Sequence, residues 1–143
     1  MSGDKHPAPH RDRLPAWLAS VLLYTGPLAW YVQLNVGFMM TSWPCFPGME
    51  RRRVPLAGYG WTRAGAVVLL VLCAAVACAA GFAALAKLRE VRDELEGDHA
   101  ALAEIGHGRT RFVALWAACL GLGFALTTLL TLVAFIMVPR CLG

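Results

Sequence analysis

Three long stretches of this chain contain no charged residue. They cover residues 14–49, 64–86 and 112–139, and they are 36, 23 and 28 residues long. A run of about 20 predominantly apolar residues is enough to cross the hydrocarbon core of a bilayer as a helix, so each stretch is long enough. The composition agrees, since 58% of the residues are hydrophobic and only 15% are charged. The sequence therefore predicts an all-α membrane protein with three transmembrane helices.

The first thirteen residues differ in character from the rest of the chain. They are polar and contain two prolines and two histidines, so we interpret them as a disordered tail. Residues 14–143 then form the transmembrane domain. A basic tail before an apolar run also resembles a secretory signal. The apolar core of such a signal is only about 7–15 residues long, so we expect the first helix to be retained.

Polar and small residues inside the predicted helices indicate how the helices pack. Gln33 and Asn35 should face other helices, because an unsatisfied amide in hydrocarbon is unfavourable. The Gly26-Pro27 pair predicts a kink in the same helix. In the second and third helices, small residues recur every four positions, which lets helix backbones approach closely. These positions are Ala77 and Gly81, Ala80 and Ala84, and the series Ala117, Gly121 and Ala125.

The polar segment between the second and third stretches has a helical pattern of its own. Its apolar residues between positions 88 and 105 fall on one seam of a helix. We expect the second helix to extend past the membrane, to end near Gly97 and to be followed by a short returning helix. This arrangement is a cytoplasmic helical hairpin. Residues 106–108 are predicted to form a loop, and the third helix is predicted to begin near Arg111.

Lysine and arginine are unequally divided between the two sides of such a protein. The tail and the second connection together carry eight of them, and the opposite side carries five. Cytoplasmic segments near membrane helices are enriched in these residues. The distribution favours a cytoplasmic N-terminus and a periplasmic C-terminus.

Two cysteines lie just outside the apolar stretches. In the favoured orientation, Cys45 and Cys141 both face the oxidising side of the membrane, where disulfides persist. We predict a disulfide that links the first and third helices, the alternative being two unpaired thiols. A further alternative is an outer-face copper or redox site, in which Met39, Met40 and Met49 supply additional soft ligands.

Several other functions lack support in the sequence. The uncharged stretches have none of the intramembrane ionisable residues typical of channels and proton-coupled carriers, although a small-solute transporter stays an alternative. None of the four histidines lies in a helix core where it could bind haem. No catalytic motif and no nucleic-acid-binding pattern are present, so we expect neither an enzyme nor a bound cofactor. The cluster Arg51, Arg52 and Arg53 is either solvated or binds anionic lipid or an acidic partner.

Four short motifs are spread from the first predicted helix to the end of the chain. They are Gly26-Pro-Leu-Ala-Trp30 with Gln33, Ser42-Trp-Pro-Cys45-Phe-Pro47, Gly108-Arg-Thr-Arg-Phe112 and Pro139-Arg-Cys141. Together they resemble uncharacterised small proteins of bacterial inner membranes that are often encoded beside cytochrome c oxidase genes. The arginine triplet is not part of that pattern. The resemblance implies a multi-pass inner-membrane accessory or assembly protein whose partners are lipids and other membrane subunits, those of a terminal oxidase among them.

Overall fold

The described residues of the protein form three long α-helices and one short 3-10 turn. The computed structural model describes residues 14–50, 52–95, 105–138 and 141. Helix α1 spans Ala16–Ser42, α2 spans Thr62–Leu95, α3 spans Ile105–Met137, and the 3-10 turn η1 spans Pro47–Met49. Within these residues the fold is all-α, as predicted. The predicted tail of residues 1–13 and the predicted turn near Gly97 lie outside the described residues.

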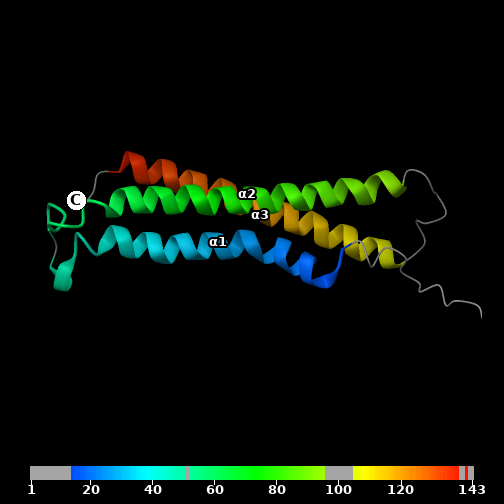
Figure 1. Cartoon of the computed structure of the whole chain (residues 1–143), viewed down its shortest axis with the longest axis horizontal. Coiled ribbons are helices and arrows are strands. Elements are labelled where there is room, and N and C mark those ends of the chain that lie inside the picture. Colours follow the sequence, from blue (N-terminus) through cyan, green and yellow to red (C-terminus); the bar gives the residue numbers. More distant parts are fainter. Residues whose placement is uncertain (1–13, 51, 96–104, 139–140, 142–143) are drawn as a thin grey trace, which may run out of the picture.

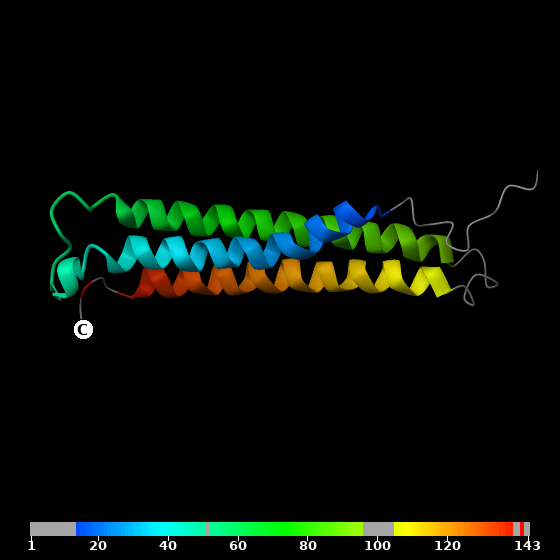
Figure 2. The same cartoon turned by 90° about the horizontal axis from the view of Figure 1, so that it is seen from below.

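The three helices lie side by side along one long axis (Figures 1 and 2). Helices α1 and α3 run in the same direction and α2 runs in the opposite direction. Helix α2 packs against both of the others, and α1 and α3 also touch each other. The end of α1, the start of α2 and the end of α3 therefore meet at one end of the bundle, which we call the disulfide end.

The core of the bundle consists mainly of alanine. Small side chains let the backbones approach each other, and the two predicted small-residue series are buried as expected. The buried alanines are Ala66, Ala74, Ala77, Ala80 and Ala84 of α2, with Ala114, Ala117, Ala118 and Ala125 of α3. The large apolar side chains are mostly exposed instead, which is the reverse of a water-soluble bundle.

One glycine from each helix meets at the same level of the bundle. A Cβ placed on Gly121 would lie 2.6 Å from the Cα of Gly81, and a Cβ placed on Gly26 would lie 3.0 Å from the Cα of Gly121. Because no larger residue fits without moving a backbone, these three glycines set the spacing of the helices. Pro27 follows this crossing, and α1 changes direction in its N-terminal part (Figure 2). Proline removes one helical hydrogen bond and crowds the preceding turn, which accounts for the bend.

Helix α3 begins earlier than the sequence predicts. Residues 106–108 belong to the helix, so the prediction of a loop there is wrong. A glycine in a helix is unfavourable by only about 1 kcal/mol relative to alanine, and a long helix that packs along most of its length tolerates two of them.

Two of the helices are long and apolar enough to cross a membrane. They are the parts of α2 and α3 that cover Thr62–Glu90 and Arg111–Met137. Helix α1 is also long, with 27 residues and no charge, and it contains two amides, two tyrosines and two tryptophans.

Candidate functional site

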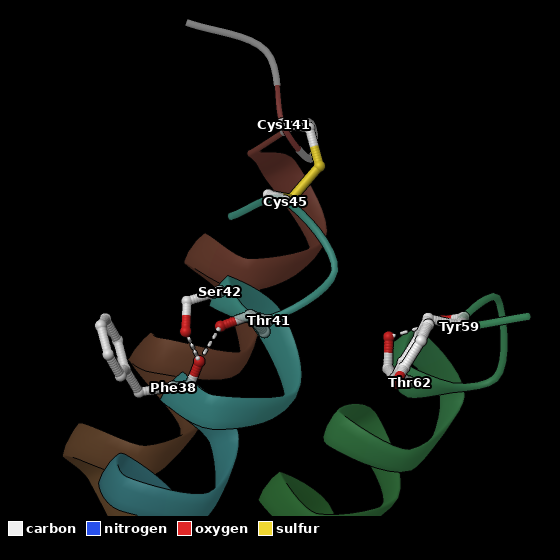
Figure 3. Close-up of a disulfide and its surroundings, with 7 residues drawn as sticks. All are labelled: Phe38, Thr41, Ser42, Cys45, Tyr59, Thr62 and Cys141. Atoms are coloured by element: carbon white, nitrogen blue, oxygen red, sulfur yellow. Dashed lines mark hydrogen bonds between the residues drawn. A yellow bond between two sulfur atoms is a disulfide. The ribbon is translucent and has the colours of Figure 1, made fainter. Parts of the chain in front are cut away.

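Cys45 and Cys141 are joined by a disulfide at one end of the bundle (Figure 3). The two residues are 96 positions apart in the sequence, and their Cα atoms are 5.4 Å apart. The bond links the chain just after α1 to the chain just after α3. Cys45 is almost completely buried, with 5% of its surface exposed, so the bond is an integral part of this end of the molecule.

The last turn of α1 places Cys45 at this position. The hydroxyls of Thr41 and Ser42 donate hydrogen bonds to the carbonyl of Phe38, at 3.1 and 2.6 Å (Figure 3). The backbone N–H groups of Cys45 and Phe46 then both donate to the carbonyl of Ser42, at 3.0 Å. The last two bonds satisfy the carbonyl of Ser42, one of those that the end of a helix leaves without an intrahelical partner.

Two backbone hydrogen bonds hold the following loop against the disulfide. The N–H of Arg52 donates to the carbonyl of Cys45 at 2.8 Å, and the N–H of Leu56 donates to the carbonyl of Pro44 at 3.0 Å. Pro44 is itself fully buried. The loop is therefore closed at its base by two hydrogen bonds, and the disulfide ties this base to the end of α3. Sequence reasoning did not find this closure, because backbone hydrogen bonds leave no residue signature.

Met49 lies at the tip of the loop with its side chain exposed. Gly48 and Met49 both have positive φ, at 65° and 66°, and this left-handed conformation is uncommon for a residue with a side chain. Met49 is 99% exposed. The double left-handed turn directs Met49 away from the bundle.

Exposed basic and aromatic side chains surround the loop. Arg52 and Arg53 are exposed, and Arg51 lies outside the described residues. In the described part of the chain, neither guanidinium pairs with a carboxylate. The exposed tryptophans Trp43 and Trp61 lie at the end of α1 and just before α2. Tryptophan and arginine at the end of an apolar bundle match the interface between a membrane and water.

The two amides of α1 lie in different environments, although both were expected to face other helices. Gln33 is 2% exposed, and its Nε2 has no hydrogen-bond partner among the described residues. Asn35 is exposed, and its Nδ2 donates to the carbonyl of Tyr31 at 2.8 Å. Two residues along a helix correspond to about 200° of rotation, so the two amides face nearly opposite directions.

The cysteines and methionines that were alternative copper ligands lie in different environments. Both cysteine sulfurs are bonded to each other, and Met39 is largely exposed. Met40 instead packs beside Gly65 of α2. No group of three or more histidines, cysteines or carboxylates that could hold a metal ion is found in the described part of the chain. The described end of the bundle thus offers a covalent link and a basic aromatic surface.

No protein-family model, no curated protein and no solved structure matches the chain.

Proposed function

We propose that this protein is an integral inner-membrane accessory or assembly protein that binds membrane subunits of a respiratory complex, without catalytic activity of its own. The proposal rests on the distribution of large apolar side chains. They are mostly exposed, which is the reverse of a water-soluble bundle. In the apolar part of α3, only 17% of the residues are buried inside the bundle, and in α2 the share is 39%. A helix whose large apolar side chains point outward needs lipid or other membrane helices around it.

The membrane placement of α1 is part of the same proposal. Its 27 residues give a length of about 40 Å, more than the roughly 30 Å of a hydrocarbon core. It packs along both α2 and α3, so it enters the membrane with them. The molecule is then a three-span bundle, and the disulfide end lies on the oxidising, periplasmic side.

The opposite end of the bundle lies in the cytoplasm in this orientation. There α2 continues beyond Lys87 as far as Leu95, and α3 begins at Ile105. Both helices therefore extend past the uncharged stretches at this end. We assign this region as the cytoplasmic hairpin, a surface available to a partner subunit or to an assembling chain.

The respiratory partner is chosen because of the sequence resemblance. The motifs around Trp30, Cys45, Phe112 and Cys141 resemble those of small inner-membrane proteins that are often encoded beside cytochrome c oxidase genes. Two of these cysteines form the disulfide, so the resemblance and the disulfide end involve the same residues.

Co-purification tests this proposal. The tagged protein is extracted from its native membranes in a mild detergent, and the associated proteins are identified by mass spectrometry. We expect subunits of a terminal oxidase at a stoichiometric level. An unrelated three-span membrane protein, tagged and expressed at the same level, serves as the control. Migration of the tagged protein without any other subunit contradicts the proposal.

A further inference from the structure

The side of α1 that faces away from α2 and α3 carries one polar residue among apolar and aromatic ones. Exposed residues follow one another at spacings of three and four along this side, which is the seven-residue repeat of a coiled-coil seam. We call them the α1 outer seam. They are Val21, Tyr24, Leu28, Tyr31, Asn35 and Phe38.

Asn35 lies too deep in the proposed membrane to be hydrated by headgroups. It precedes Trp43 by eight residues, which is about 12 Å along a helix. Trp43 is exposed at the end of α1 and marks the level of the interface. Asn35 is therefore within the hydrocarbon half-layer, which is about 15 Å thick.

The amide of Asn35 is not satisfied by its own chain. One of its N–H groups donates to the carbonyl of Tyr31, and within the described residues its Oδ1 accepts no hydrogen bond. Exposed hydroxyls elsewhere in the bundle use their single donor in the same way, so they keep no free donor. Those of Thr127 and Thr131 donate to carbonyls four residues earlier in α3, at 2.7 and 2.9 Å. A primary amide has two donors and an acceptor, so it needs a partner from outside this chain.

We propose that the α1 outer seam binds the same seam of a second copy of this protein, with the two Asn35 amides bonded to each other. Two copies in one membrane share the same orientation. A two-fold axis along the membrane normal then places identical residues at the same depth. The amide of Asn35 thus meets an amide that both donates and accepts, whereas any other helix would need its own polar group at this depth.

A single buried asparagine in an apolar seam is a known device for setting register and oligomeric state. The spacing of the seam corresponds to a left-handed crossing of the two α1 helices. The inference rests on the proposed membrane placement of α1, but it does not depend on which respiratory subunit is the partner.

Cysteine cross-linking in native membranes tests the seam. Leu28→Cys places a thiol on it, and Leu126→Cys places one on the outer side of α3. The two leucines are matched, since each is 59% exposed. Both substitutions are made together with Cys119→Ser, because Cys119 is an exposed free thiol. With a mild oxidant, we expect a covalent dimer from the Leu28→Cys protein and none from the Leu126→Cys protein.

The amide is tested separately in reconstituted vesicles, where the monomer–dimer equilibrium is followed by energy transfer between labelled copies. Asn35→Leu should raise the dimer dissociation constant about three- to thirtyfold, the range that interhelical hydrogen bonds produce in membranes. Asn35→Gln keeps an amide and should restore part of the loss. An unchanged dissociation constant for Asn35→Leu overturns the role of the amide.

Three cross-linking outcomes overturn the inference while the proposed function stands. The first is equal dimer formation by the Leu28→Cys and Leu126→Cys proteins, and the second is no dimer from either protein. The third is a cross-link from the Leu28→Cys protein to a chain of different mass, which assigns the seam to a partner subunit. Failure of the proposed function is recognised independently, as the absence of oxidase subunits after co-purification.

Discussion

Gly81 of α2 and Gly121 of α3 are in backbone contact, so that a Cβ on Gly121 would lie 2.6 Å from the Cα of Gly81 and 2.7 Å from its nitrogen. This contact, together with Gly26 on the other side of Gly121, brings all three helices together at one level. Apolar side chains gain little free energy by moving from lipid into a contact between helices. Close backbone packing is therefore a main source of helix association in a membrane.

Gly121→Ala should therefore destabilise the bundle. Overpacking a well-packed contact costs about 1–3 kcal/mol, and here the obstruction is backbone that cannot rotate away. Gly123→Ala is the matched control on the same helix, because a Cβ at that position meets nothing within 4 Å. Thermal unfolding of the two proteins in detergent measures the difference. Equal melting temperatures would show that the glycine contact does not determine the helix spacing.

Gln33 is the buried polar group whose replacement should increase stability. Its Nε2 has no acceptor in the described part of the chain, and leaving a buried donor unpaired costs about 1–3 kcal/mol. Gln33→Met keeps a similar shape without the donor, so we expect a higher melting temperature. The control is Thr128→Val, which removes a buried hydroxyl that does have a partner, the carbonyl of Phe124 at 2.8 Å. A lower melting temperature for Gln33→Met would mean that the amide is satisfied by a bound water.

The disulfide makes the two cysteines act as one unit. Cys45→Ser and Cys141→Ser should lower the melting temperature equally, and the double variant should lower it no further. For a loop of about 100 residues, the chain-entropy contribution is at most about 5 kcal/mol, and it is smaller in a bilayer because the helices are already constrained. Cys119→Ser, at an exposed free cysteine, is the control and should have no effect. Additive effects of the two single variants would show that the two residues act independently, as two unpaired thiols would.

Much of the fold could be predicted because lipid imposes a simple requirement. Long uncharged stretches must form helices, since a helix satisfies all of its own backbone hydrogen bonds. The small-residue series of α2 and α3 then indicate which sides come together. The pairing of Cys45 with Cys141 followed from placing both on the oxidising side, and their separation of 96 residues contains no such information.

The details that could not be predicted depend on how each helix is rotated about its own axis and on which residues of different helices lie at the same level of the bundle. Gln33 and Asn35 are both amides in the same helix, and only the packing of α1 decides that Gln33 is buried and Asn35 exposed. The sequence marks Gly26 only as the neighbour of a helix-bending proline, whereas in the structure it also forms the contact with Gly121. The predicted start of α3 is too late, because two glycines are unfavourable by only about 1 kcal/mol each in a long packed helix.

Labelling from one side of the membrane tests the central claim, that three helices span the bilayer and that both cysteines lie on its outer face. Intact cells are treated with a reductant that does not cross membranes and then with an impermeant maleimide. We predict that Cys45 and Cys141 are both labelled, and only after reduction, whereas Lys87→Cys at the opposite end is labelled only after the cells are opened. Labelling of position 45 and position 141 from different sides, or recovery of the protein without detergent, would contradict the account.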